Sequence, residues 1–477
     1  MLAREDHDAL LGIVGASGLL TAAPDLVPYE TAARYGGGKA AAVVRPADTP
    51  QVSAVLRHCV RRQLAFTPQS GNTGLVLGST PDASGRQIVL SLDRLRAPPR
   101  VDALDRTATV AAGVRLSALN ATLAPHNLCL PIDVSSDPMI GGMVATNTGG
   151  ARYLRYGDMR RHVLGLEVVL PDESGTVLTL SNGLRKDNAH LDLRQLFIGS
   201  CGAFGIITSA TLEVHPRPRQ SAVALLVPRD DDAVLELLTA FEAECGEFLT
   251  AFEGMSESAM RHALEHIPAL RNPFPEGLPA YAVLVELTTS SHRAGEAALD
   301  GILESVLTGL TERQSAPLVD ARVGQPESLW ALRHSLSEGL RATGPVVGFD
   351  LSFRRSEVMA FRRVAIAQVA SMFPQHEVCD FGHVADGGVH FNLVLRPGNA
   401  QDGARVEALR HHILELAVRD FGASFSGEHG IGRANQGAYD HYIPAVTQHY
   451  SAAIAALFAR LPAAAVRFGP ALSLGED

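Results

Sequence analysis

Apolar and polar positions between residues 40 and 123 alternate with two different periods, which predicts a mixed α/β beginning to the chain. Residues 52–60 carry apolar side chains at helical spacing, and Thr49-Pro50 before them suits a helix N-cap followed by a first turn. Short apolar runs predict strands around this helix, at residues 42–44, 64–67, 88–92 and 107–111. Residues 116–123 predict a further short helix.

The pattern changes after Ser221, where large glycine-rich loops disappear for a long stretch. Strand-like and helical runs alternate there, at residues 222–227, 233–245, 282–287 and 293–310. This alternation predicts a second domain in which an antiparallel sheet carries helices on one face. Pro216 and Pro218, with basic residues around them, suit a linker between the two domains.

The composition excludes several classes of protein. The chain has 477 residues, 46% of them hydrophobic and 19% charged, which suits a soluble globular protein of two or three domains. Its 41 basic and 51 acidic residues give a formal charge of −10, so we expect no nucleic-acid partner. No apolar run approaches the roughly 18 residues of a membrane span, and the N-terminus lacks the pattern of a signal peptide. Five scattered cysteines without a CxxC pair argue against a disulfide framework and suit the cytoplasm.

Three glycine-rich loops are the first sign of a ligand site. They run from Pro68 to Gly74, from Asp137 to Gly150 and from Gly199 to Thr208. Closely spaced glycines let backbone N–H groups converge on an anion, and Asn72 and Thr73 add side-chain donors. Three such loops in one region favour a long ligand with a pyrophosphate and a flat ring system, which describes a nucleotide cofactor.

The common nucleotide fingerprints are missing from the sequence. No GxxxxGK[ST] motif occurs, which excludes a P-loop. Gly12, Gly15 and Gly18 have the spacing GxxGxxG rather than GxGxxG, and no strand is predicted before them. We assign these glycines to an N-terminal helix and turn, and an NAD-type Rossmann fold is disfavoured.

A pair of histidines brackets a glycine turn in the C-terminal half. In the predicted strand at residues 389–394, His390 and Asn392 share one face. His383 precedes this strand, and the turn at residues 386–388 folds the chain back so that the two imidazoles can converge. A metal site and a pair of bystander histidines are comparably good interpretations of this segment alone.

The segment from Gly427 to Gly432 adds a carboxylate at Glu428 and a further imidazole at His429. Three protein ligands, His383, His390 and Glu428, would leave an open coordination position, as in catalytic zinc sites. His429 could then act as a base beside the metal. The alternative interpretation is a loop with incidental polar residues.

These segments together resemble the FAD-dependent D-2-hydroxyacid dehydrogenases, which have the vanillyl-alcohol-oxidase type of FAD fold. The shared motifs occur in the family's order between about Tyr29 and Tyr442: PQSGNTGLVLG, PMIGGMVATNTGGARYLRYGD, GSCGAFGIIT, GHVADGGVHFN and SGEHGIG. The group includes D-2-hydroxyglutarate dehydrogenase, D-lactate dehydrogenase and the FAD subunit of glycolate oxidase.

The resemblance implies an α+β protein with a two-subdomain FAD-binding domain and a substrate (cap) domain of an antiparallel sheet with helices. We expect an N-terminal helical segment at residues 1–38, the FAD-binding domain at 39–218 and the cap domain at 219–422. Residues 423–477 would return to the FAD domain and complete the active site.

The resemblance also assigns roles to individual residues. FAD contacts are expected from Pro68, Gly71, Asn72, Thr73, Gly74, Gly142, Thr146, Asn147, Gly149, Gly150, Gly202 and Ile207. The divalent metal, usually zinc, is expected at His383, His390 and Glu428. The substrate is expected at Arg333, Ser337 and Asn392, with Arg333 holding a carboxylate and His429 accepting the proton.

The implied reaction is oxidation of a D-2-hydroxy acid to the 2-oxo acid by hydride transfer to FAD, and D-2-hydroxyglutarate is the favoured substrate. D-lactate or another short D-2-hydroxy acid is the alternative within this class. Two other hypotheses are a flavin-free metallohydrolase and an FAD subunit of a glycolate-oxidase-like complex. The implied electron acceptor is an electron-transfer flavoprotein or a quinone. A homodimer and peripheral association with a membrane are compatible with the sequence.

The sequence departs from the family pattern at two places. Gly348 stands where the D-2-hydroxyglutarate enzymes usually carry a lysine, two residues before Asp350. Arg467-Phe468-Gly469-Pro470 replaces an asparagine-proline-glycine-lysine stretch near the flavin. The first change removes one expected contact with a substrate carboxylate.

Overall fold

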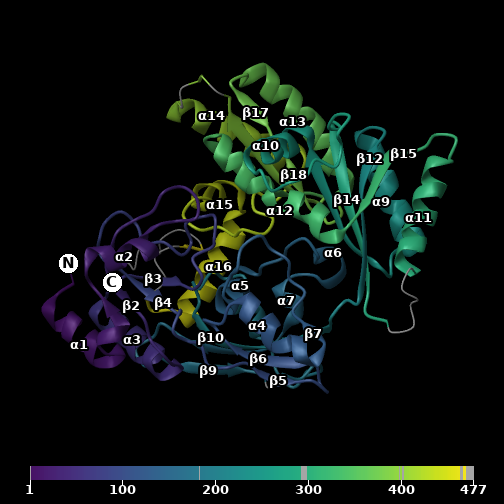
Figure 1. Cartoon of the computed structure of the whole chain (residues 1–477). Helices are drawn as coiled ribbons and strands as arrows, with labels where there is room; N and C mark the ends of the chain where they lie inside the picture. Colours follow the sequence, from purple (N-terminus) through teal and green to yellow (C-terminus); the bar gives the residue numbers. More distant parts are fainter. Residues whose placement is uncertain are drawn as a thin grey trace.

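The computed structural model describes residues 2–181, 183–291, 298–396, 398–399, 402–461 and 466–468. The residues before β12 (Gln220–Pro228) and the region from β12 onward form two parts that meet along one side, and the C-terminal helices return to lie between them (Figure 1). Within the described residues, no helix is long and apolar enough to cross a membrane.

A small sheet of four strands begins the N-terminal part. Its order is β1 (Leu19–Leu20), β2 (Ala40–Val44), β4 (Gln87–Ser91) and β3 (Phe66–Gln69). The last three strands run parallel, and β1 is antiparallel to β2. Helices α1 (Arg4–Val14), α2 (Ala23–Glu30) and α3 (Thr49–Arg62) accompany this sheet. The N-terminal helix and turn predicted for the first glycines are confirmed, because Gly12 lies in α1 and Ala16–Gly18 form a 3₁₀ turn.

The predicted helix at residues 52–60 is confirmed as α3, but its N-cap is Asp48 rather than Thr49. The Asp48 carboxylate accepts a hydrogen bond from the Gln51 backbone N–H at 2.8 Å, as N-cap side chains do. The Thr49 hydroxyl instead donates to Glu167 at 2.6 Å. A tertiary partner thus decides which of two adjacent capping residues is used.

A second, antiparallel sheet completes the N-terminal part. Its order is β5 (Arg100–Asp102), β6 (Thr107–Ala111), β10 (Ile206–Glu213), β8 (Val163–Val169) and β9 (Val177–Leu180). Five helices belong to this region: α4 (Leu116–Leu123), α5 (Ile140–Thr146), α6 (Tyr153–Tyr156), α7 (Met159–His162) and α8 (Arg194–Phe197). β7 (Leu128–Cys129) and β11 (His215–Pro216) pair beside it.

The large sheet of the other part is antiparallel throughout its main path. Its order is β15 (Leu318–Gly324), β12 (Gln220–Pro228), β14 (Tyr281–Thr289), β13 (Leu249–Ser256), β18 (Phe381–Gly382), β19 (Gly388–Leu395) and β16 (Val346–Ser352), with β17 (His376–Val378) also on β19. Its helices are α9 (Asp231–Cys245), α10 (Glu257–His266), α11 (Ala298–Thr311), α12 (Pro326–Thr343), α13 (Val358–Met372) and α14 (Gly403–Glu415). Residues 293–297 of the predicted fourth run lie outside the described residues.

Helices cover both faces of this sheet, so the expectation of helices on one face was wrong. Every residue of β14 is buried, and alternate side chains join two separate cores. Val283 and Val285 pack in the core with α9, α11 and α13, whereas Ala282 and Leu284 pack in the core with α10 and α12. A strand buried on both sides has no polar alternation, which is the pattern that the sequence shows here.

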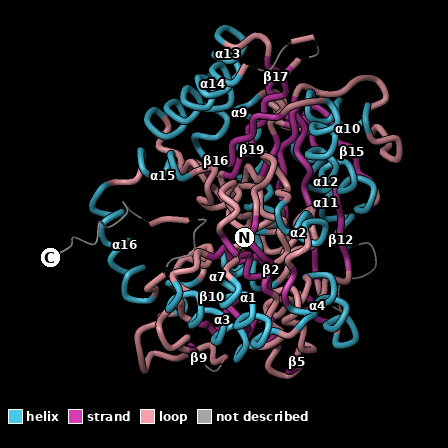
Figure 2. The backbone as a smooth tube through the Cα atoms, turned by 90° about the vertical axis from the view of Figure 1, so that its left-hand side faces the viewer, coloured by secondary structure: helices cyan, strands magenta, loops and turns pink. Residues whose placement is uncertain are grey.

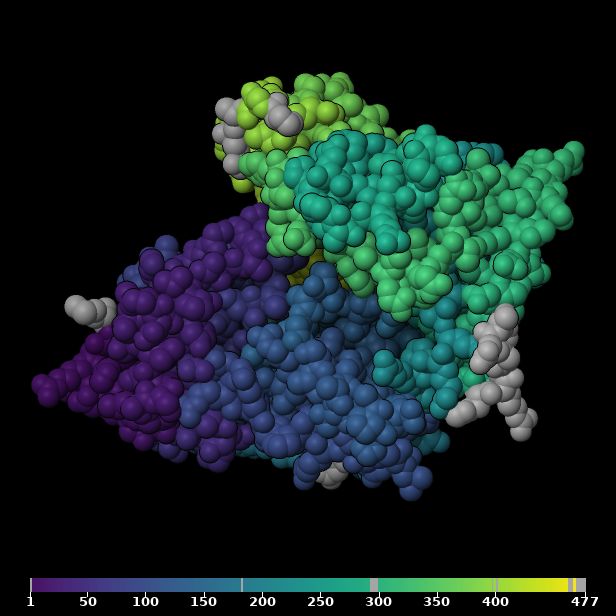
Figure 3. Space-filling model, viewed as in Figure 1, coloured from purple at the N-terminus to yellow at the C-terminus, as the bar shows by residue number. Residues whose placement is uncertain are grey.

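The last helices, α15 (Gln436–Tyr442) and α16 (Ala445–Phe458), pack against the N-terminal part (Figures 1 and 2). The Phe458 ring lies 5.1 Å from that of Phe197, and the Phe468 ring lies 5.3 Å from that of Phe204. A hollow separates the two parts on the face shown in Figure 3, with atoms of the C-terminal segment visible at its floor.

Candidate active site

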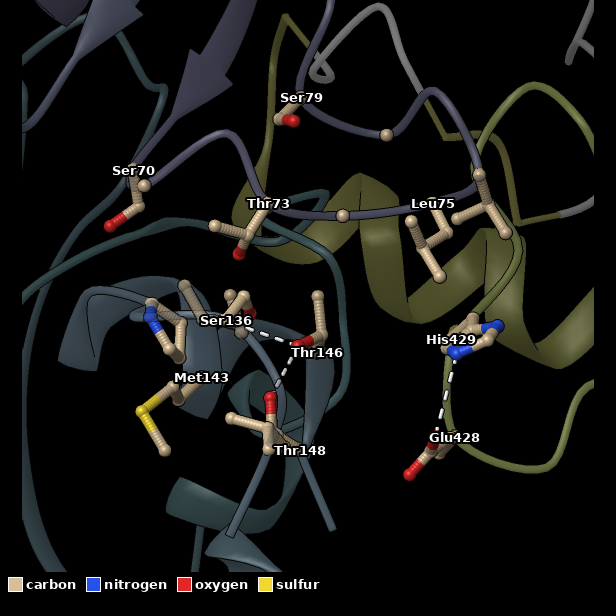
Figure 4. Close-up of a pocket in the computed structure, with 18 of the residues that line it drawn as sticks. Ser70, Thr73, Leu75, Ser79, Ser136, Met143, Thr146, Thr148, Glu428 and His429 are labelled. Atoms are coloured by element: carbon tan, nitrogen blue, oxygen red, sulfur yellow. Dashed lines mark hydrogen bonds and ion pairs between the residues drawn. The ribbon is translucent and has the colours of Figure 1, made fainter. Parts of the chain in front are cut away.

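A cavity of about 1810 Å³, including its part open to solvent, lies where the three glycine loops meet the large sheet and the segment around Glu428. Its lining runs from the three glycine loops to His383 and His390, so the cavity suits an extended ligand. In Figure 4 the loop bearing Ser70 and Thr73 faces the α5 region with Met143 and Thr146. Glu428 and His429 lie at one side of the space between them (Figure 4).

Most of the residues expected to contact FAD line this cavity. They are Pro68, Gly71, Asn72, Thr73, Gly74, Gly142, Thr146, Gly150, Gly202 and Ile207. Asn147 and Gly149 are not among the lining residues. Asn147 is the C-cap of α5, and its amide donates to Asp158 at 2.7 Å, which fixes the loop after the helix.

The Asn72 side chain also serves the loop rather than offering donors to a ligand. Its amide donates to the carbonyl oxygens of Thr31 at 2.8 Å and Pro28 at 3.3 Å, and its oxygen accepts from Ser79 at 2.9 Å. The expectation that this amide contributes a ligand donor therefore does not hold. The backbone N–H groups of the loop remain as the donors that suit an anion.

Gly202 shows why the cavity wall needs glycine. Its φ is +79°, and a Cβ on this residue would lie 2.9 Å from Cγ of Pro68 on the first glycine loop. Both conditions disfavour any larger residue. The close approach of the first and third glycine loops thus shapes one end of the cavity.

The predicted histidine cluster forms at the other end of the cavity. Nε2 of His390 lies 3.3 Å and Nε2 of His383 lies 4.0 Å from Oε1 of Glu428. Nε2 of His429 lies 3.4 Å from the same oxygen, and the His429 ring stacks on that of His390 with centroids 5.3 Å apart. Nitrogen and oxygen ligands of a tetrahedral zinc, at about 2.0–2.1 Å from the ion, are separated by comparable distances.

The register of two strands brings a further acid to this cluster. β16 and β19 pair so that Asp350 lies opposite His390 and Gly348 lies opposite Asn392. The Asp350 carboxylate accepts hydrogen bonds from the backbone N–H groups of Glu428 at 2.9 Å and His429 at 2.7 Å. Asp350, His390, Glu428 and His429 could share one metal ion. Because both backbone donors already use Oδ2 of Asp350, this residue holds the Glu428 loop in place.

Glu253 joins the cluster to the arginine expected at the substrate. This carboxylate is 1% exposed and accepts from Nδ1 of His383 at 2.7 Å. It also accepts from Nε of Arg333 at 2.9 Å and pairs with Nη2 of Arg333 at 2.7 Å. A histidine that donates through Nδ1 presents Nε2 to a metal, which is the usual arrangement around metal-binding histidines.

The three residues expected at the substrate all line the cavity, as do the expected metal ligands. Arg333 is 8% exposed, and its guanidinium lies over the Phe381 ring at 5.0 Å. Ser337 follows it on α12, and Asn392 donates to the His390 carbonyl oxygen at 3.1 Å. The structure therefore brings the motifs of α12, β19 and the Glu428 loop to one place.

The charges of this cluster are strongly coupled. Burial alone would raise the pKa of Glu428, but hydrogen bonds from His390 and His429 and the charge of His383 hold that pKa well below its usual range. Burial opposes the cationic form of His383, yet Glu253 raises the pKa of this imidazole to about 9. Burial lowers the pKa of His390 and raises that of Asp386 to about 6. These shifts favour an anionic Glu428 beside a neutral His390 and a cationic His383, whose Nε2 proton a bound metal would displace.

Five residues that line or support the site were not assigned to it by the sequence analysis. They are Arg34, Asp133, Glu253, His334 and Asp350. Asp133, four residues before the second glycine loop, lies 3.3 Å from Nε2 of His334 on α12. Glu253 is the only charged residue in the fully buried strand β13, and that contrast is the signal that could have indicated it.

Two family profiles match the chain. The profile of the FAD binding domain matches residues 40–181, and that of the C-terminal domain of FAD linked oxidases matches residues 217–459. Among solved structures, p-cresol methylhydroxylase with substrate bound has a TM-score of 0.75 and 16% identity, covering 96% of this chain and 95% of that one. An alkyldihydroxyacetonephosphate synthase has a TM-score of 0.70 and 17% identity, covering 89% and 82%. These similarities support the vanillyl-alcohol-oxidase type of fold, and the fold and the profiles together define an FAD-linked oxidoreductase.

Similar proteins narrow the class. D-2-hydroxyglutarate dehydrogenase of Xanthomonas citri pv. viticola is 35% identical over 82% of this chain and 81% of its own length. The mitochondrial D-2-hydroxyglutarate dehydrogenase of Rattus norvegicus is 35% identical over 82% and 70%. A D-2-hydroxyglutarate–pyruvate transhydrogenase of Saccharomyces cerevisiae is 31% identical over 85% and 81%. The chain belongs to the FAD-dependent D-2-hydroxyacid dehydrogenase family, whose members act on CH–OH donors.

Membership of this family overturns the flavin-free metallohydrolase hypothesis, because the first two glycine loops belong to an FAD-binding domain. Of the four residues near the chain end that depart from the family pattern, the structure describes the first two. Arg467 and Phe468 lie beside α15, whereas Gly469 and Pro470 lie outside the described residues.

Proposed function

We propose that the protein oxidises D-2-hydroxyglutarate to the 2-oxo acid, using FAD and a divalent cation that is most simply zinc. The observation that carries the proposal is the meeting of Arg333, His383, His390, Glu428 and His429 at one end of a cavity whose other end is formed by the glycine loops. The similar dehydrogenases support the choice of substrate.

The residues present suit both groups. FAD, bound through the ten lining residues of the glycine loops, would supply the hydride acceptor for C2 of the hydroxy acid. A divalent ion held by His383, His390 and Glu428 would supply a Lewis acid for the 2-hydroxyl. The paired Nδ1 of His383 and the depressed pKa of Glu428 support this ligand set.

The protein's own side chains would position the substrate and accept its proton. Arg333 offers a planar guanidinium to a substrate carboxylate, with the Ser337 hydroxyl and Asn392 amide beside it. His429 is the proposed acceptor of the hydroxyl proton: Nδ1 lies 3.5 Å from the Asp350 carboxylate, so Nε2, 3.4 Å from Glu428, is the nitrogen that faces the proposed metal site. Burial lowers the pKa of His429, but Asp350 and Glu428 outweigh burial and raise it, which strengthens this imidazole as a proton acceptor.

The proposal extends to the chain's organisation and its electron transfer. The division into residues 1–38, 39–218, 219–422 and 423–477 is supported by the large sheet, which begins with β12 at Gln220. We propose an electron-transfer flavoprotein or a quinone as electron acceptor and the cytoplasm, with the option of membrane docking, as location. The yeast transhydrogenase supports testing a 2-oxo acid as acceptor as well.

An anaerobic visible spectrum tests the proposed reaction. We expect an oxidised-flavin spectrum that D-2-hydroxyglutarate bleaches faster than D-lactate, and slower bleaching after treatment with a chelator. Faster bleaching by D-lactate would instead favour the short-chain alternative. A flavin that neither acid reduces would contradict the proposed reaction and favour a subunit of a glycolate-oxidase-like complex.

A further inference from the structure

Arg34 places a guanidinium in the cavity at the position that Gly348 leaves open. Arg34 lies in the loop between Thr31 and Gly37 and lines the cavity with residues of β16 and β19. A Cβ built on Gly348 would lie 2.7 Å from Nη1 of Arg34 and 3.0 Å from Oδ1 of Asn392. The guanidinium of an N-terminal loop therefore occupies the space that a side chain at position 348 would enter.

Contacts to the large sheet's helices hold this loop in place. The hydroxyl of Tyr35 accepts a hydrogen bond from Nη2 of Arg410 on α14 at 3.0 Å. The Arg410 guanidinium lies 5.2 Å from the centroid of the Tyr35 ring and 5.8 Å from that of Phe349 on β16. Tyr35 has a φ of +65°, so the loop adopts a sparsely populated conformation to make these contacts. The contacts of Tyr35 thus hold the adjacent Arg34 against β16.

The two guanidiniums near the substrate end differ in their partners. Arg333 is paired with the buried carboxylate of Glu253, which offsets its charge. Arg34 has no carboxylate partner among the residues that the structure describes; it contacts the Tyr35 ring and hydroxyl, and its charge acts on the nearby His429. A half-buried cation in a cavity that has no carboxylate partner among the described residues suits an anionic group of a ligand.

We propose that Arg34 binds the second carboxylate of a 2-hydroxy dicarboxylate substrate, in the space that Gly348 leaves open. This inference rests on the proposed function and explains the departure at position 348. A lysine there would start within 2.7 Å of the Arg34 guanidinium, so the two cations exclude each other. The charge is retained in the cavity but is supplied by a different segment of the chain.

Kinetics with two matched substrates test this assignment in the holoenzyme. D-2-hydroxyvalerate has the chain length of D-2-hydroxyglutarate and lacks its second carboxylate. For Arg34→Ala we expect the ratio of kcat/KM between the dicarboxylate and the monocarboxylate to fall at least about tenfold, chiefly through KM. Arg34→Lys should keep part of this preference. Arg34→Ala combined with Gly348→Lys should restore part of it from the other segment.

Binding without turnover separates this inference from the proposed reaction. Titration of the flavin absorbance with 2-oxoglutarate reports the dicarboxylate site even in a protein that oxidises neither acid, and we expect Arg34→Ala to weaken this binding at least about tenfold. Arg86→Ala, which removes the same charge from an exposed position outside the cavity, is the control and should leave both readouts unchanged. Equal losses for both substrates, unchanged 2-oxoglutarate binding, or loss of FAD from the Arg34 variants would each overturn the assignment.

Discussion

Nδ1 of His383 donates a hydrogen bond of 2.7 Å to the buried carboxylate of Glu253. This bond fixes the imidazole so that Nε2 points toward Glu428, and it makes Glu253 a positioning residue for the proposed metal. The same carboxylate restrains Arg333. One acid on β13 therefore holds two side chains that the proposed reaction needs.

Glu253→Gln should weaken metal binding while FAD stays bound. The amide keeps the size of the side chain but removes the negative charge, so His383 loses its anionic partner without a cavity being formed. We expect the affinity for zinc to fall by about 10–100-fold, as is typical when the partner of a ligating histidine is altered. Competition with a coloured chelator measures this affinity, and the flavin absorbance measures FAD content.

The control for this substitution is Glu257→Gln on the neighbouring helix, where the carboxylate pairs with Arg261 and is 39% exposed. It should leave zinc affinity unchanged. Zinc bound equally well by Glu253→Gln and the unmodified protein would show that Glu253 supports only the fold.

His390→Ala should abolish turnover without releasing the flavin. The imidazole lies 3.3 Å from Glu428 and far in sequence from the glycine loops, so its loss removes a proposed ligand and spares the cofactor contacts. We expect kcat to fall by more than about 100-fold, measured by anaerobic reduction with D-2-hydroxyglutarate. His449→Ala, at an exposed position on α16, is the control. Near-full activity of His390→Ala would contradict the metal proposal.

Gly74→Val should lose FAD while the fold persists. Gly74 lines the cavity, and a Cβ on it would meet no atom within 4 Å, so the added side chain would occupy ligand space without a clash inside the protein. We expect a colourless protein with an unchanged far-ultraviolet circular dichroism spectrum. Gly437→Val, which also meets open space but lies on α15 outside the cavity, should stay yellow. A fully flavin-loaded Gly74→Val would contradict the role proposed for this loop.

The parts of the site that the sequence predicted are those with a local signal. The glycine loops can be recognised from a few consecutive residues. The turn between His383 and His390 indicated that their rings would converge, and in the structure the ring centroids lie 5.4 Å apart. Asp350 could not be assigned in this way, because its role depends on the register between β16 and β19. Pairing register is decided by the whole sheet rather than by one strand.

The fold, like the site, could be predicted from the sequence only where the signal is local. The apolar runs predicted most strands, yet the helices on both faces of the large sheet follow from tertiary packing that no single run specifies. Arg34 is the most distant case, since it acts beside residue 348 from a loop more than 300 positions earlier. Only the three-dimensional structure relates such positions.

Two histidines, the buried His162 and the half-buried His215, predict how stability depends on pH. Burial lowers the pKa of His215 to about 4, and the neighbouring His162, whose ring lies 5.1 Å away, has its pKa lowered by burial as well. Both are neutral in the folded protein, whereas the unfolded chain binds protons below about pH 6.5. The contribution of these two histidines to the free energy of unfolding should therefore be constant above pH 6.5. It should fall as the pH decreases from 6.5 toward 4.

His215→Gln should reduce this dependence on pH. His215 is partly exposed, so after allowance for solvent screening we expect it to contribute about 1–2 kcal/mol of the loss between pH 7.5 and pH 5.0. Urea unfolding of the holoenzyme at the two pH values measures the difference, and the readout is the change with pH rather than the absolute stability, because Gln also loses the ring contacts with Tyr156 and His162. His449→Gln, at an exposed position, should retain the full dependence of the unmodified protein. An identical loss in His215→Gln and the unmodified protein would assign the acid sensitivity to other groups.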